Sequence, residues 1–540
     1  MREIAKRYIL GKCPFHGKIL LPTKSMFSKL TLSAFCTCAV LFAPQASAQA
    51  NLTRTGGVLG NVLSYSLEGA PGKIYVLLPS PSQGPTPLSI IDPLDPRSMD
   101  VGIELLNRLV IGSFDGAGNA TVNFPLPAAP ALSGIPIYTQ MMTVPGSPTI
   151  VDEISNRTDF VLGLPGDSHL ALGELSVETA GYTSVVLDDG RVLLGGGGVV
   201  NGLGATVPST SLRIYNPQTQ GFEDLAASLT YPSITAAGTK LSDGRVLFCG
   251  GIGATDSVLS GASIFDPSTG LTTAAASMPV PRAQHTATLL ADGRVFVTGG
   301  VKALNSADLL SALGDILGSS TIYDPVGNSW SAAASMPQPA IGHSATRLPS
   351  GRVLITGGLE IGSLFGVPIP SITARCLFFN PATGTMTSAP SLSGVRALHG
   401  QIGLSDGRVL VAGGAAGDVL TQSFFSVATC RVFNEATNSW TSVGDLPEVR
   451  TYPNLVEAGG MVHVLSGVGT IDLTTLSGSP VVGIASADLT SFAWTSSGTM
   501  VFARPLSAAL AVDGGERIVV LGPGDNGTAV VDRTAEVFIP

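Results

Sequence analysis

The stretch DGRVFVTGG, from Asp292 to Gly300, is repeated along this chain. Close copies read DGRVLLGGG, DGRVLFCGG, SGRVLITGG and DGRVLVAGG, and they begin at Asp189, Asp243, Ser350 and Asp406. Two more divergent copies are centred on Gly460 and Gly515. The chain therefore contains seven copies of one unit.

The spacing of the copies indicates the architecture. Between equivalent glycines, successive copies are 54, 49, 58, 56, 53 and 55 residues apart, which is the period of a four-stranded propeller blade. In each unit an apolar run predicts a first strand, Asp-Gly a tight turn, and Arg-Val-Leu the start of a second strand. An aromatic residue and an Asx-Pro turn then end a third strand, as in Tyr323-Asp324-Pro325. A large apolar residue follows, such as Trp330, and is expected to pack between blades.

Paired glycines, an aromatic residue before an Asx-Pro turn and then a Trp, at this period, resemble Kelch repeats and the propeller of galactose oxidase-like proteins. The resemblance covers residues 167–540. It implies an all-β fold whose main part is a seven-bladed Kelch-type β-propeller. Propellers carry many unrelated activities, so the resemblance concerns the fold and not the function.

The last unit ends at its third strand, because the chain stops at Pro540. Leu170 to Thr179 aligns with the fourth-strand segments that precede other units, such as Thr273 to Arg282. We therefore expect this N-terminal segment to pair with the C-terminal strand. Such pairing closes the ring and removes two exposed sheet edges.

Residues 49–166 lack the repeat and predict a small all-β domain of the sandwich type. Its expected strands lie at 73–78, 108–113, 120–124 and 137–144. Asp115 to Gly118 is expected to form a hairpin turn, and Leu164 to Asp167 a linker. The stretch from Val122 to Met142 resembles one found in small β-domains of secreted bacterial proteins. We expect the propeller to remain folded when residues 51–165 are removed.

Residues 1–48 have the features of a secretory signal peptide. Lys24 and Lys29 precede an apolar run from Leu30 to Phe42, which is shorter than the ~20 residues needed to span a bilayer. Small residues ending at Ala48 form the expected cleavage site, and Met26 is an alternative start of translation. We predict a secreted, periplasmic or cell-surface protein with no stable membrane insertion after signal removal.

The leader carries seven Lys or Arg and one Glu, so its removal changes the formal net charge from −9 to −15. We expect no binding of nucleic acid by so acidic a chain. Three cysteines remain after cleavage, Cys249, Cys376 and Cys430. Cys376 and Cys430 occupy equivalent places in adjacent blades, about 13 Å apart in a ring of this kind, which is beyond disulfide reach. We expect three buried free thiols.

Strand order gives the propeller two different rims. The Asp-Gly and Asx-Pro turns share one, the turn rim. The long loops after each Gly-Gly pair and the crossings between blades share the other, the loop rim, which is the candidate binding face. Val301 to Ser320 is the longest of these loops and could hold a short helix between Leu304 and Leu317.

Three histidines recur on the loop rim, eight residues before the turn glycine in three successive units: His285, His343 and His399. On innermost strands, at a radius of about 8 Å, neighbouring histidines would lie about 7 Å apart and could share a metal ion. The alternative is that each histidine forms hydrogen bonds between blades. We favour this alternative because a residue repeated at one position of a repeat usually serves the architecture.

Four arginines recur just upstream, at the crossings between blades: Arg282, Arg396, Arg450 and Arg504. They either bind an acidic ligand or hold the blades together through ion pairs and carbonyl contacts, and we favour the second role. The arginine of each DGR turn is interpreted as architectural.

Galactose oxidase-like proteins bind copper on this face through a Tyr-His pair, a Tyr joined to a Cys, and a His from a domain after the propeller. No Tyr precedes a His in this sequence, and Cys249 has no assignable Tyr partner. We therefore predict no catalytic residues, no metal and no cofactor. The favoured interpretation is a monomeric, non-catalytic binding or scaffold protein with a protein or glycan ligand on the loop rim. The alternative is an extracellular carbohydrate-active or metal-dependent enzyme without the copper-radical ligand set.

Overall fold

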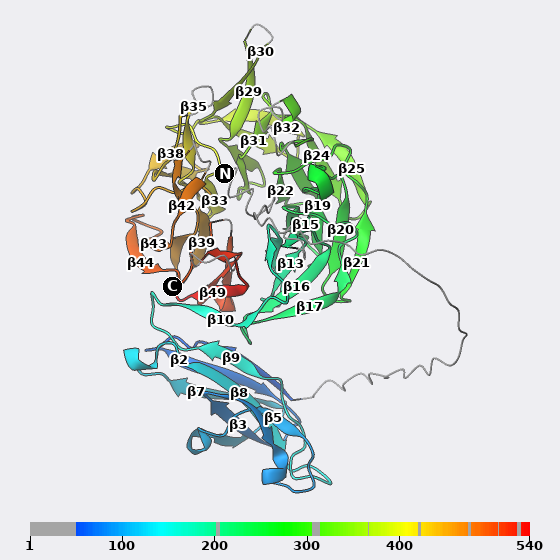
Figure 1. Cartoon of the computed structure of the whole chain (residues 1–540), viewed down its shortest axis with the longest axis vertical. Coiled ribbons are helices and arrows are strands. Elements are labelled where there is room, and N and C mark those ends of the chain that lie inside the picture. Colours follow the sequence, from blue (N-terminus) through cyan, green and yellow to red (C-terminus); the bar gives the residue numbers. More distant parts are fainter. Residues whose placement is uncertain are drawn as a thin grey trace, which may run out of the picture.

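The computed structural model describes residues 50–200, 206–304, 314–364, 367–418, 423–472, 477–505, 507–525 and 531–540. The chain forms a seven-bladed β-propeller with a small β-sandwich beside it (Figure 1). The proposed signal peptide, the Met26 start and most of the expected helix between Leu304 and Leu317 lie outside the described residues. Within the described residues, no helix has the length and hydropathy needed to cross a membrane.

Each blade is a four-stranded antiparallel sheet, and the strands of the first six blades follow the order of the chain. Blade 1 contains β12 (Thr183–Val186), β13 (Val192–Gly195), β16 (Ser211–Asn216) and β17 (Gly221–Ser228). Blade 2 contains β18 (Ala237–Lys240), β19 (Val246–Cys249), β20 (Ala262–Asp266) and β21 (Leu271–Ala275). Blade 3 contains β22 (Thr286–Leu289), β23 (Val295–Thr298), β24 (Ser320–Asp324) and β25 (Ser329–Ala333).

The next blades repeat this plan. Blade 4 contains β27 (Ser344–Arg347), β28 (Val353–Thr356), β31 (Cys376–Asn380) and β32 (Thr385–Ala389). Blade 5 contains β33 (Gly400–Gly403), β34 (Val409–Ala412), β37 (Cys430–Asn434) and β38 (Ser439–Ser442). Blade 6 contains β39 (Asn454–Ala458), β40 (Met461–Leu465), β43 (Gly483–Asp488) and β44 (Thr495–Thr499).

The burial of each strand follows from its place in the blade. The second strand lies between neighbouring blades on both faces, and all four residues of β23 are buried. The first strand lines the channel, so every residue of β22 is half-buried. The outermost strand is largely exposed, and in β25 Trp330 is the large apolar residue that turns inward. Trp330 packs on Tyr323, with ring centroids 4.9 Å apart, and its Nε1 donates to the carbonyl of Ala276 in blade 2 at 2.6 Å. The Trp therefore links two blades.

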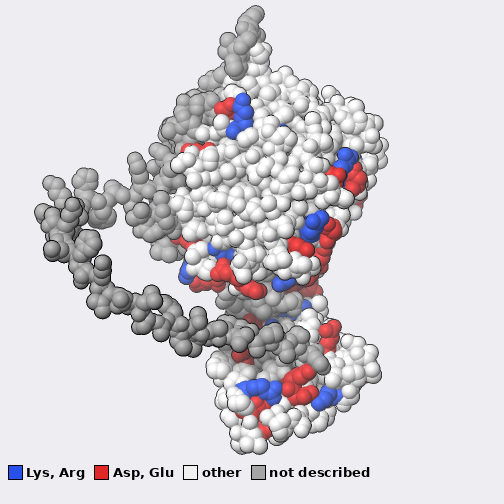
Figure 2. Space-filling view, turned by 90° about the vertical axis from the view of Figure 1, so that its right-hand side faces the viewer, with Lys and Arg blue, Asp and Glu red and all other residues white. Residues whose placement is uncertain are grey.

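The repeated turn needs its Asp and Gly for separate reasons. Gly293 has a φ of 86°, in the left-handed region that favours glycine. Asp292 accepts a hydrogen bond from the backbone N–H of Arg294 at 3.1 Å and pairs with the Arg294 guanidinium at 2.7 Å. On the face of the molecule drawn in Figure 2, oppositely charged side chains lie next to one another in small groups separated by uncharged surface.

Blade 7 contains both ends of the ring. Its sheet has the order β10 (Ser168–Glu174), β49 (Thr534–Phe538), β46 (Arg517–Leu521) and β45 (Ala508–Val512). The N-terminal strand β10 occupies the outermost place and pairs antiparallel with the C-terminal strand β49, with Leu170 opposite Glu536. Buried side chains from blade 7 and blade 1 share one core, including Ala171, Val192 and Val537. The first half of the segment that we expected to close the ring, Leu170 to Glu174, therefore lies on the C-terminal strand, whereas Thr179 begins β11 (Thr179–Ala180), which pairs in a different sheet.

Two sheets form the sandwich. One has the order β1 (Asn51–Thr55), β2 (Val62–Glu68) and β7 (Asn119–Pro125). The other has the order β6 (Val110–Ser113), β3 (Ile74–Ser80), β8 (Pro136–Val144) and β9 (Thr158–Val161). Their inner faces meet in a core that includes Leu52, Tyr65, Leu77, Met141 and Phe160. A further hairpin, β4 (Gln83–Pro87) and β5 (Ser98–Val101), covers part of the outer face of the second sheet.

One expectation for the sandwich is wrong. Asp115 to Gly118 is a tight turn, with the Gly118 N–H donating to the Asp115 carbonyl at 3.0 Å, but it does not close a hairpin. The strands that it joins, β6 and β7, belong to different sheets. Local turn chemistry specifies a reversal of the chain, whereas the choice of partner strand depends on packing between the sheets.

Candidate functional site

The loop rim carries additional β-structure above the blades. In blades 1, 4, 5, 6 and 7 the loop after the second strand is a small hairpin. These hairpins are β14–β15 (Gly198–Val200 and Thr206–Pro208), β29–β30 (Leu359–Leu364 and Val367–Ile372), β35–β36 (Ala415–Asp418 and Ser423–Ser426), β41–β42 (Val468–Asp472 and Ser477–Pro480) and β47–β48 (Gly524–Asp525 and Val531–Asp532). The short strands β11 (Thr179–Ala180) and β26 (Ala340–Ile341) of the crossings pair with two of them. In these five blades the long loops of the loop rim are thus β-structured in their described parts.

The hairpins of blades 4, 5 and 6 stand next to one another, and we call them the hairpin wall. Strand β30 contacts β35, and β36 contacts β41. Ser426 on β36 shares a hydrogen bond of 2.8 Å with Thr451 of the next crossing and donates to the carbonyl of Gly469 on β41. On the same strand, Phe425 is 57% exposed. Hairpin β29–β30 projects from the ring (Figure 1).

The three rim histidines lie between consecutive blades. Nε2 of His343 lies 3.2 Å from Oγ1 of Thr286 in blade 3, and Nε2 of His399 lies 2.8 Å from Oγ1 of Thr356 in blade 4. Nε2 of His285 lies 3.6 Å from Sγ of Cys249 in blade 2. Each imidazole therefore contacts the preceding blade, and all three side chains are buried.

The paired glycines make room for these rings. A Cβ on Gly299 would lie 2.4 Å from Cε1 of His343, and a Cβ on Gly250 would lie 2.7 Å from Cε1 of His285. A crossing carbonyl lies equally near, that of Arg282 at 2.3 Å from the same point on Gly250 and that of Ala340 at 2.7 Å from Gly299. Distances this short do not occur around a real Cβ, so the first glycine of the pair lets both the crossing backbone and the histidine of the next blade approach.

Burial lowers the pKa of these histidines. It brings the pKa of His343 to about 4, and burial together with the nearby Arg282 brings the pKa of His285 to about 3. Burial and Arg396 act in the same way on His399, whose pKa is also about 3. The imidazoles are therefore neutral at pH 7. Their Nδ1 atoms are buried and have no hydrogen-bond partner among the described residues.

The four crossing arginines are also inside the protein, each at most 2% exposed. Nη1 of Arg282 donates to the carbonyls of Gly299 and Ser319, both at 2.9 Å. Arg396 makes the same contacts in blade 5, with Gly413 at 3.2 Å and Thr429 at 3.0 Å. Equivalent carbonyl contacts are made by Arg450 and Arg504, and Arg504 also pairs with the buried carboxylate of Glu536 at 3.4 Å. The guanidinium groups thus fasten each crossing to the blade that follows it.

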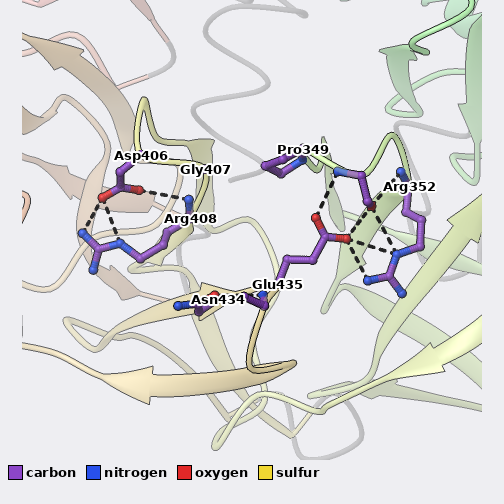
Figure 3. A pocket seen from close by; sticks show the side chains of 9 residues that line it. Pro349, Arg352, Asp406, Gly407, Arg408, Asn434 and Glu435 are labelled. Carbon is purple, nitrogen blue, oxygen red and sulfur yellow. Dashed lines mark hydrogen bonds and ion pairs between the residues drawn. The ribbon is translucent and has the colours of Figure 1, made fainter.

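An open hollow of about 740 Å³ lies on the opposite, turn rim, between blades 4 and 5 (Figure 3). Arg352 and Glu435 line one side of it, and Asp406 and Arg408 line the other. Glu435 pairs with Arg352 at 2.7 Å, and Arg408 pairs with Asp406. Glu435 stands where most units have the proline of the Asx-Pro turn, and the repeat pattern predicted no role for it beyond that turn.

The cysteines are buried free thiols, as expected for Cys249, Cys376 and Cys430. Burial raises the pKa of each thiol to about 12. At neutral pH the thiolate, which is the reactive form, is therefore almost absent.

Comparisons with protein-family models and with curated proteins give no match. Among solved structures, YjhT is similar with a TM-score of 0.43 and 16% identity over 57% of this chain and 95% of that one. A fungal alcohol oxidase of the AA5 family, in complex with copper, has a TM-score of 0.52 and 16% identity over 70% of this chain and 76% of that one. This chain has a galactose oxidase-like propeller fold. At such low identity the likeness concerns the fold alone.

Copper in the fungal enzyme raises the question of whether the residues of this chain fit a metal ion. Within the parts of the chain that the structure describes, no three His, Cys, Asp or Glu side chains are placed to hold one. The rim histidines direct their Nε2 atoms to neighbouring blades. These residues do not fit a metal site, and we assign no metal chemistry to this rim.

Proposed function

We propose that this protein is a secreted, non-catalytic binding or scaffold protein that holds a protein or glycan ligand on the loop rim of its propeller. The hairpin wall is the observation that carries this proposal. It places β-structured loops from three adjacent blades side by side, with Phe425 57% exposed. An aromatic side chain held on a rigid support is typical of the anchors in protein interfaces, and an exposed ring face also suits stacking against a sugar.

The turn rim is less suited to this role. Its charged groups pair with one another, as Arg352 does with Glu435 and Arg294 with Asp292. At blades 7 and 1 it also contacts the sandwich, because Arg54 pairs with Asp513 at 3.0 Å. A ligand on this rim would have to displace existing partners.

The test uses the mature protein, screened against immobilised glycans and against proteins of the extracellular fraction. Phe425→Ser should weaken any specific binding at least roughly tenfold, as expected for loss of an aromatic anchor. The matched control is Val326→Ser, because Val326 is 94% exposed and follows an Asx-Pro turn on the turn rim. If binding is lost in Val326→Ser and retained in Phe425→Ser, the ligand site is on the turn rim and the proposal fails.

The alternative is an extracellular carbohydrate-active or metal-dependent enzyme, and the structural likeness to a copper alcohol oxidase is the observation in its favour. About one copper per chain in the purified protein, or release of peroxide with a sugar or alcohol substrate, would support it. Either result would replace the binding proposal. The proposed secretion is tested separately, since N-terminal sequencing of the exported protein should begin at Gln49.

A further inference from the structure

The sandwich and the propeller share a buried polar junction on the turn rim. Arg54, on β1 of the sandwich, is 1% exposed and pairs with Asp513 of blade 7 at 3.0 Å. Arg517, at the start of β46, pairs with the same carboxylate at 3.2 Å. Both guanidiniums donate to the carbonyl of Gly56, and both lie over the ring of Phe160, with Cζ to centroid distances of 4.7 and 5.8 Å.

Blade 1 joins the same junction through Gln218, in the turn between β16 and β17. Its amide nitrogen donates to Asp513 of blade 7 at 3.2 Å and to the backbone carbonyl of Arg54 at 3.1 Å. Its amide oxygen accepts from the backbone N–H of Arg54 at 2.8 Å, and its own carbonyl accepts from the N–H of Asp159 at 2.6 Å. One side chain therefore connects blade 7, blade 1 and the sandwich.

The repeat allows a direct comparison of this junction with the other blades. In blade 7, Ile518 on the second strand lies opposite Phe538 on the third, as Val295 lies opposite Tyr323 in blade 3. Arg517 directly precedes Ile518 and Arg294 directly precedes Val295. The two arginines therefore occupy the same place in the repeated turn. Arg294 and Asp292 are 36% and 46% exposed, whereas Arg517 and Asp513 are 0% and 3% exposed. The same kind of ion pair is thus at the surface in blade 3 and buried beneath the sandwich in blade 7.

Blade 7 is also where the ring closes, because its outermost strand β10 comes from the other end of the propeller sequence. That strand contacts β9 of the sandwich and β17 of blade 1. We propose that the sandwich stabilises the closure of the ring by holding blade 7 to blade 1, where β10 completes the last blade. We call the sandwich in this role the clasp, and the paired strands β10 and β49 the closing joint. The clasp goes against the expectation that the propeller remains folded without residues 51–165. Their removal would take from Arg517 the Gly56 carbonyl and the Phe160 ring and from Asp513 its partner Arg54.

The proposal predicts where the native protein opens when the clasp is weakened. Amide hydrogen exchange reports local opening, so the joint should open first. In the full mature chain, Asp513→Asn should raise exchange in β10 and β49 by roughly tenfold or more and leave blade 3 unchanged. Asp292→Asn, the matched change in the exposed turn of blade 3, should leave β10 and β49 as in the wild type.

Gln218→Ala is the second variant, because it removes the link to blade 1 while Arg54, Arg517 and Asp513 all stay in place. It should raise exchange in β10 and β49 in the same way, and it replaces Asp513→Asn if that chain does not fold. If the folded Asp513→Asn or Gln218→Ala protein exchanges β10 and β49 at the wild-type rate, the sandwich is not a clasp. Equal acceleration across all blades also rejects the proposal, because it indicates a general loss of stability.

Discussion

Glu435 of blade 5 supplies the carboxylate that Ser350 of blade 4 cannot. In four other units an Asp begins the DGR turn and binds the Arg of its own turn, as Asp292 binds Arg294. Ser350 replaces that Asp in blade 4, and Arg352 instead pairs with Glu435 at 2.7 Å. The Ser350 backbone N–H also donates to Glu435, at 3.1 Å. A contact within one turn has thus become a contact between two blades.

We expect Glu435→Gln to lower the free energy of unfolding by about 1 kcal/mol, because it removes a charge-assisted contact from a partly exposed pair. Adding Ser350→Asp should restore most of the loss by rebuilding the pair within the turn. Urea denaturation of the single and double variants measures both effects. Strictly additive effects of the two substitutions would show that Ser350 and Glu435 do not exchange roles.

The same contact should weaken in acid. Burial alone would raise the pKa of Glu435, but hydrogen bonds from Ser350 and Arg352 outweigh it and bring the pKa below its usual value. A lowered pKa in the folded state stabilises the protein above the ordinary Glu range of about 4.3 and loses its effect as pH falls through the folded value. Wild type and Glu435→Gln should therefore differ in unfolding midpoint at pH 7, and the difference should shrink as the pH falls below the ordinary Glu range. A constant difference across this range contradicts the assignment.

The rim histidines should make the stability of the protein depend on pH over a higher pH range than Glu435 does. Their pKa values are about 3 to 4 in the folded protein, because burial disfavours the charged form, and about 6.5 in the unfolded chain. The unfolded chain then binds more protons between these values, so stability should fall as pH decreases from about 6.5 towards 4. In His343→Gln this dependence should be shallower by about one proton, as measured from unfolding midpoints. An unchanged slope would show that His343 does not titrate in this way.

His343→Ala tests whether the imidazole is architectural. It leaves the Thr286 hydroxyl without its partner and opens space beside Gly299, at a cost of about 1 to 3 kcal/mol. The metal content of the purified protein should not change. Loss of bound metal with unchanged stability would identify the histidines as ligands instead.

The three thiols should resist modification in the native protein. With a pKa of about 12, each is protonated at pH 8, and each is buried. A thiol reagent should react with Cys249, Cys376 and Cys430 only as fast as the protein unfolds, and all three should react at once in denaturant. Rapid reaction of any one in native buffer would indicate local opening at its strand.

The sequence by itself determined the blade plan. The Asp-Gly turn, the Asx-Pro turn and the apolar runs act over a few residues, so the strands of the blades and their order could be predicted from the repeat. Burial of the rim histidines and cysteines also followed from their place in it. The closing strand was found because one unit lacked a fourth strand.

Only the tertiary structure decided which partner each polar side chain takes. Arg294 and Arg517 occupy the same place in the repeat, yet one is 36% exposed and the other is buried under the sandwich. Arg352 likewise turns to Glu435, which lies 83 residues away in the chain. A guanidinium accepts any carboxylate or carbonyl within reach, so its partner depends on which surfaces the packing of blades and domains brings together. The hairpin wall, the exposed Phe425 and the clasp at the closing joint follow from that packing and from no local pattern.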